Sequence, residues 1–93
     1  MKLALTSAQQ EKLLKYLNEN PDAEQLSVNE YVADLYDLDD PMTINFLIGE
    51  DGSIELAAVA QLLYDEEQDG WYMGDRIEDE AAVLAALTES DAI

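Results

Sequence analysis

The chain has 93 residues, of which 48% are apolar, and its net charge is −18. This length suits one small domain (residues 1–93), and the apolar fraction suffices for a single hydrophobic core. Cysteine and histidine are both absent, which excludes disulfides, thiolate metal sites and the most common general base. No apolar run approaches the roughly 20 residues of a membrane span, and no signal-peptide pattern occurs, so we expect a cytoplasmic protein without membrane contact.

The negative charge is unevenly distributed along the chain. Residues 1–18 contain three lysines against one glutamate, whereas residues 19–93 contain 21 acidic residues and a single arginine. A surface of this kind repels nucleic acids, anionic membranes and acidic substrates, and it attracts basic proteins. It also destabilises the compact state through self-repulsion, so we expect the acidity to serve a function or to reflect the environment.

Two helices are predicted in the first half. The first covers residues 7–18, where Thr6 or Ser7 can act as the N-cap with a glutamine three residues later. Its apolar stripe comprises Leu13, Leu14 and Leu17. The second covers residues 28–38, where Ser27 and Glu30 have the spacing of a capping box. Its core-facing stripe comprises Val28, Tyr31, Val32 and Leu35.

Three aspartates follow this second predicted helix: Asp37, Asp39 and Asp40. At a helix C-terminus the dipole opposes each negative charge by roughly 0.3–1 kcal/mol. Selection for stability alone would favour lysine there, so we interpret these aspartates as functional.

The second half predicts strands and a final helix. Residues 43–48 alternate as a strand, and Asp51-Gly52 is a common hairpin pair. Residues 54–64 fit either a strand or a helix; we favour the strand, because Tyr64 and Trp71 flank a turn and residues 71–73 then form the return strand. A helix over residues 78–88 completes an α+β domain. The expected order is α-α-β-β-β-α, with a three-stranded antiparallel sheet covered by helices.

The turn between these last two strands reads D-E-E-Q-D-G and matches half of a calcium-binding loop. With Gly70 at position 6 of an EF-hand, acidic residues occupy positions 1, 3 and 5, but position 12 is Arg76 instead of the required glutamate. We therefore expect a solvated hairpin turn with Asp69-Gly70 at its positive-φ corner, and neither a metal site nor a cofactor. Trp71 is expected in the core, and Tyr72 is a candidate partner contact.

No pattern in the sequence indicates catalysis. Without histidine there is no standard serine triad, and the single G-x-x-G, at residues 49–52, is filled with acids that would repel phosphate. An acyl carrier would also be small and acidic, but its modified serine is absent here. We expect that the protein is not an enzyme.

The charge density suggests a DNA mimic. A compact globule of this length is roughly 32 Å across, so the net charge of −20 on residues 19–93 corresponds to about 1.6 Å per charge, close to the ~1.7 Å of duplex DNA. In size and composition the chain is similar to phage-encoded DNA-mimic inhibitors, including anti-restriction and anti-CRISPR proteins, although no motif carries that likeness. Such a protein would bind the basic nucleic-acid-binding surface of a host protein or complex and would not bind nucleic acid itself. The candidate partner-binding residues are Asp37, Asp39, Asp40, Glu50, Asp51, Asp65, Glu66, Glu67, Asp69, Tyr72 and Asp75.

Two alternatives remain open at this point. The chain could be an acidic interaction module or antitoxin-like adaptor that binds a basic protein unrelated to nucleic acids. It could also be a halophilic domain whose acidity is environmental, which predicts unfolding at low salt. The sequence does not determine the oligomeric state.

Overall fold

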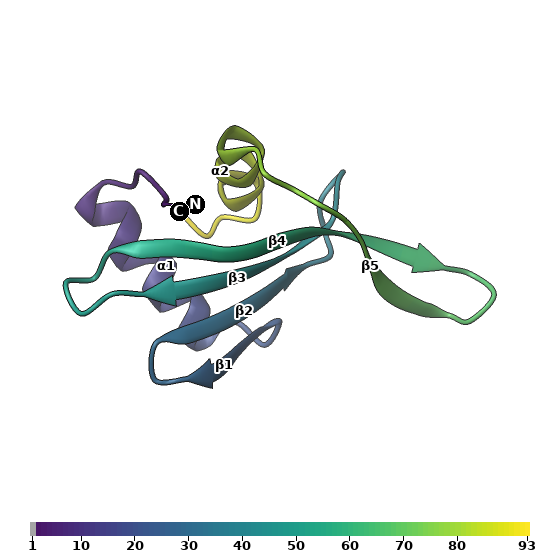
Figure 1. Cartoon of the computed structure of the whole chain (residues 1–93), viewed down its shortest axis with the longest axis horizontal. Helices are drawn as coiled ribbons and strands as arrows, with labels where there is room; N and C mark the ends of the chain where they lie inside the picture. The colour runs from purple at the N-terminus through teal and green to yellow at the C-terminus, as the bar shows by residue number, and fades with distance from the viewer. Residues whose placement is uncertain (1) are drawn as a thin grey trace.

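The computed structural model describes residues 2–93, which form two helices and one five-stranded antiparallel sheet (Figure 1). The strands lie in chain order from β1 at one edge to β5 at the other. The elements are α1 (Ser7–Glu19), β1 (Ala23–Ser27), β2 (Glu30–Leu35), β3 (Met42–Ile48), β4 (Ile54–Asp65), β5 (Gly70–Arg76) and α2 (Glu80–Glu89). The three-stranded sheet that we expected is therefore wrong, although the α+β class is correct.

The error lies in the second predicted helix, because residues 23–35 form the β1–β2 hairpin instead. Ser27 and Glu30 do not form a capping box; they face each other as the last pair of this hairpin. Buried and half-buried side chains alternate along β2, with Tyr31, Ala33 and Leu35 facing the core. Val28, which the predicted helix would have buried, is 86% exposed. Tertiary packing of alternate side chains overrides a local helix-start pattern here.

The other elements are confirmed with small shifts of their ends. Helix α1 begins as expected, because the Thr6 hydroxyl accepts the amide of Gln9 and the Gln9 side chain accepts the amide of Thr6. Residues 54–64 belong to strand β4, and residues 71–73 lie in the return strand β5. At α2, the Asp79 side chain caps the helix by accepting the amide of Ala81.

One face of the sheet forms the hydrophobic core together with both helices. The fully buried side chains at its centre are Leu13, Ile44, Phe46, Val83 and Leu87. Cross-strand neighbours lie on the same face, and the pairs Tyr31–Phe46 and Ile44–Val59 run through this core. In Figure 1, helix α1 lies behind the sheet and α2 lies above β4.

The molecule is elongated, with dimensions of 44 × 25 × 20 Å and a radius of gyration of 12.9 Å. The length arises because β4 continues beyond its partner β3 and forms a projecting hairpin with β5 (Figure 1). Among residues 2–93, no helix has the length and hydrophobicity that crossing a membrane requires.

Candidate partner-binding surface

The projecting part of the β4–β5 hairpin, residues 61–76, is called the arm below. Pairing between β3 and β4 ends at Met42–Gln61, whereas pairing between β4 and β5 continues to Asp65–Gly70. The arm therefore has two strands where the rest of the sheet has up to five. A two-stranded ribbon has little core of its own and depends on contacts between its own side chains.

Exposed apolar side chains are concentrated on the arm. Eight large apolar side chains of residues 2–93 are exposed, and five of them belong to the arm. These five are Leu63 (39% exposed), Tyr64 (46%), Trp71 (44%), Tyr72 (53%) and Met73 (68%). A patch of this kind on a small acidic protein is typical of an interaction site.

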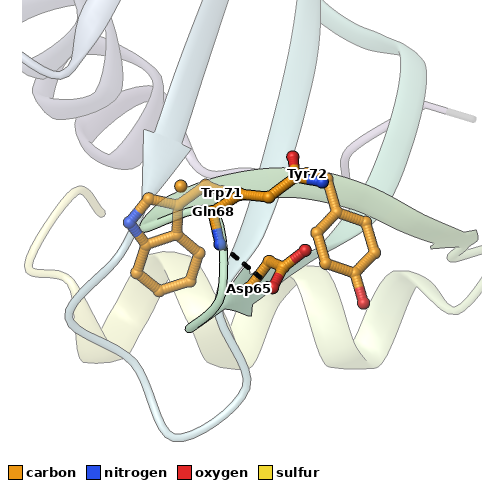
Figure 2. A pocket seen from close by; sticks show the side chains of 5 residues that line it. Asp65, Gln68, Trp71 and Tyr72 are labelled. Atoms are coloured by element: carbon orange, nitrogen blue, oxygen red, sulfur yellow. Dashed lines mark hydrogen bonds between the residues drawn. The ribbon is translucent and has the colours of Figure 1, made fainter.

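Trp71 is not a core residue, which corrects our expectation. It lies between Tyr36 and Tyr64, with ring centroids 5.1 Å from Tyr36 and 5.4 Å from Tyr64. Figure 2 shows the rings of Trp71 and Tyr72 on either side of Asp65, and both side chains are exposed, so neither is a core residue. The tilted ring contacts hold Trp71 in place while almost half of its surface stays exposed. Tyr72 is exposed as expected.

The turn at the tip of the arm is ordered by its own carboxylates. Asp65 accepts the amide of Glu67 at 2.9 Å and that of Gln68 at 3.4 Å, the second bond being drawn in Figure 2. Asp69 has a positive φ of 52° and accepts the hydroxyl of Tyr64. The positive-φ corner is thus Asp69 alone, because Gly70 does not adopt that conformation. These bonds leave Glu66 and Glu67 exposed at the tip.

The loop between β2 and β3, residues 36–41, brings the first acidic cluster to the arm. The amide of Leu62 donates to the carbonyl of Pro41 at 2.9 Å, and Tyr36 contacts Trp71. Asp37, Asp39 and Asp40 therefore lie in a loop beside the base of the arm, and not at a helix C-terminus. No helix dipole opposes these charges, because residues 30–35 form a strand, and the loop places them near the arm as the binding hypothesis requires.

Asp39 and Asp40 also border a cleft that sequence analysis missed. This cleft, of about 820 Å³, lies between the 36–41 loop, β4 and α2. Its apolar walls include Leu38, Ile77 and Ala85. The carboxylates around it are Asp39, Asp40, Glu78, Asp79 and Glu89. These residues come from three separate parts of the chain, so no local pattern could have grouped them.

Glu50 and Asp51 do not join the other candidate residues. They lie in the β3–β4 turn, at the opposite end of the long axis from the tip of the arm (Figure 1). Asp51 has a local role: the hydroxyl and amide of Ser53 donate to its carboxylate and lower its pKa from the ordinary value of 3.8. The amide bond measures 3.0 Å.

The carboxylates are largely uncompensated by positive charge. All 22 acidic side chains are at least partly exposed, and the described residues contain two ion pairs, Lys12–Asp91 at 3.1 Å and Arg76–Glu78 at 3.6 Å. Burial raises the pKa of the Tyr36 hydroxyl, and the nearby Asp34 carboxylate raises it further. Tyr36 therefore stays protonated and donates to Asp34 at 3.3 Å.

Among the described residues, no group of three or more acidic side chains is arranged to hold a metal ion. Comparison of the chain with protein-family models, with curated proteins and with solved structures finds no match.

Proposed function

We propose that the protein is a non-enzymatic inhibitor that mimics DNA and occupies the basic nucleic-acid-binding surface of another protein or complex. The observation that carries this proposal is the combination of an elongated body with exposed, mostly unpaired carboxylates along its length. A long axis of 44 Å and a net charge of −18 give about 2.4 Å per charge, compared with about 1.7 Å in duplex DNA. This density is lower than the sequence suggested, because the molecule is longer than a compact globule.

The position of the acids supports a binding face at one end of the molecule. The 36–41 loop and the arm contribute two adjacent clusters, and Tyr36 and Trp71 connect them. The residues we propose for partner binding are Asp37, Asp39, Asp40, Asp65, Glu66, Glu67, Asp69, Tyr72 and Asp75. Their carboxylates would pair with arginine and lysine side chains that otherwise contact phosphates.

The first test is capture of partners from a nuclease-treated bacterial lysate on the immobilised protein, followed by salt elution. The proposal predicts that one DNA- or RNA-binding protein is captured and that added duplex DNA displaces it. This protein should elute as the salt concentration rises, because the Debye length falls from about 10 Å at 0.1 M to about 3 Å at 1 M. Retention of a basic protein that DNA does not displace would contradict the mimic. So would a chain that captures nothing and folds only in molar salt.

A charge-matched pair of variants then locates the face on the purified partner. The first variant neutralises the tip of the arm through Asp65→Asn, Glu66→Gln, Glu67→Gln and Asp69→Asn. The second removes the same four charges near α1 and the β1–β2 hairpin through Glu11→Gln, Glu19→Gln, Glu24→Gln and Glu30→Gln. We expect the first to abolish binding at physiological salt and the second to retain most of it. Equal loss in both would mean that only net charge matters.

A second function is favoured by a separate observation. A DNA mimic needs only negative charges in place of phosphates, but the arm also exposes five large apolar side chains beside its acids. An acidic interaction module for a basic protein that does not bind nucleic acid would use both features. The two functions differ in whether duplex DNA competes with the partner.

A further inference from the structure

We propose that the free edge of β5 accepts an extended, basic segment of the partner as a sixth strand of the sheet. This inference rests on the proposed function for the basic character of the partner. It adds the mode of recognition, which is strand addition through main-chain hydrogen bonds at the arm.

Strand β5 forms an open edge of the sheet. β5 pairs with β4 on one side only, and no backbone hydrogen bond joins its outer side to another described residue between Gly70 and Gly74. Such an edge presents a row of N–H and C=O groups that an extended chain can pair with, whereas a helix cannot.

The two edge strands of the sheet, β1 and β5, differ in how well they are protected from pairing. β1 has five residues, a bulge between Gln25 and Ser27, and α1 packed beside it. β5 has seven residues with neither lysine nor proline, and its centre is the exposed run Trp71-Tyr72-Met73. Its register irregularity with β4 lies beyond this run, between the pairs Leu62–Met73 and Ala60–Arg76. Proteins usually shield edges by shortness, bulges, proline or inward charge, and the centre of β5 has none of these.

The side chains along the β5 edge are both apolar and acidic. Trp71 and Met73 lie on one face of β5, and Tyr72 lies on the other, so a sixth strand would find apolar contacts on both faces. Five carboxylates of the arm surround this run: Asp65, Glu66, Glu67, Asp69 and Asp75. An incoming strand that combines apolar side chains with lysine or arginine complements both features.

A second copy of the chain fits the edge less well. Two copies would bring together net charges of −18 each. In an antiparallel β5–β5 pair centred on Tyr72, Asp69 of one copy would lie opposite Asp75 of the other, and like charges in this position are destabilising. We therefore expect the protein alone to be monomeric.

The test uses a synthetic probe: an acetylated and amidated nonapeptide of alternating lysine and valine. The control is the same peptide with an N-methyl group on every valine and lysine amide, which keeps the charge but removes the main-chain donors of both strand edges. Trp71 is the only tryptophan, so its fluorescence reports binding at the arm. We expect the N-methyl peptide to bind at least about tenfold more weakly, and we expect the parent peptide to slow amide hydrogen exchange in residues 70–76.

A matched pair of protein variants separates strand addition from simple charge attraction. Met73→Glu adds a negative charge at the β5 edge, and Val28→Glu adds the same charge at the β1–β2 turn; the parent side chains are 68% and 86% exposed, so both variants should fold. Strand addition predicts about fivefold or greater weakening by Met73→Glu, because a charge replaces an apolar contact, and no weakening by Val28→Glu. Charge attraction alone predicts equal or tighter binding in both.

Three outcomes would overturn the inference. They are equal binding of the N-methyl peptide, undiminished binding by Met73→Glu, and a dimer of the free protein that Met73→Glu dissociates in analytical ultracentrifugation. None of these measurements uses the natural partner or DNA. Failure of the peptide test would therefore leave the proposed inhibitor function standing, and failure of DNA competition would leave strand addition standing.

Discussion

Strand β4 passes through two different environments. In its first half Ile54, Leu56 and Val59 are buried under the helices, whereas Leu63 and Tyr64 are exposed where the strand has only β5 as a neighbour. The helix-covered body derives its stability from a shared core, whereas the arm relies on the ring contacts of Trp71 and on hydrogen bonds at its tip. A region that is anchored locally can open without global unfolding, which suits a binding element.

The largest effect should come from the core of the body. Phe46→Ala removes a fully buried ring from the centre of the sheet and should lower the free energy of unfolding by about 3–5 kcal/mol in urea titrations. If that variant does not fold, Ile44→Val should cost about 0.5–1.5 kcal/mol at a neighbouring buried position. A loss below about 1 kcal/mol for Phe46→Ala would show that the stabilising core lies elsewhere.

The β3–β4 and β4–β5 hairpins offer the next comparison, because each has a glycine in a different conformation. Gly52, in the β3–β4 turn, has a φ of +83°, whereas Gly70, in the arm, has an ordinary φ. Gly52→Ala should therefore lower the free energy of unfolding by about 1–2 kcal/mol. Gly70→Ala should leave it unchanged or raise it by up to about 1 kcal/mol, since its new methyl group would meet only the carbonyl oxygen of Gln68, at an ordinary contact distance of 4.0 Å. Equal effects in thermal unfolding would contradict this difference.

The sequence predicted most of the body but little of the first hairpin. Strands 43–48 and 54–64 were identified because their apolar residues alternate, and α1 because its capping residues agree with its apolar stripe. The helix prediction for residues 27–35 was wrong because Ser27 and Glu30 fit two local patterns, a capping box and a tight hairpin. Only the pairing of β2 with β3, which is a long-range contact, decides between them.

For the binding surface, the sequence indicated the residues but not their arrangement. Four of the five acids of the arm lie within residues 65–69, so composition was enough to find them. The adjacency of Asp39 and Asp40 to the arm and the exposure of Trp71 both depend on the length by which β4 exceeds β3. No local propensity encodes that difference in strand length.

Removing the aromatic contact should loosen the arm and leave the body intact. Trp71→Ala eliminates both ring pairs, each worth about 0.5–1.5 kcal/mol beyond the area it buries. We expect amide exchange to accelerate severalfold in residues 62–65 and 70–76, with little change in residues 44–46 or in the urea midpoint. Leu47→Ala, at another partly exposed strand position, is the control. A decrease in the free energy of unfolding as large as that of Phe46→Ala would mean that arm and body unfold together.

The smallest expected effect is a pKa change at Asp51, whose role in the β3–β4 turn is structural. Its folded pKa is depressed by Ser53, so its contribution to stability is present above the ordinary value of 3.8 and is lost as pH falls through the folded pKa. Ser53→Ala removes the hydroxyl donor and should raise the Asp51 pKa toward 3.8 in an NMR titration of the carboxyl group. Ser27→Ala, in the β1–β2 hairpin, should leave that pKa unchanged. An unshifted pKa in Ser53→Ala would mean that the turn does not hold Asp51, and the residue would then be as available to a partner as the acids of the arm.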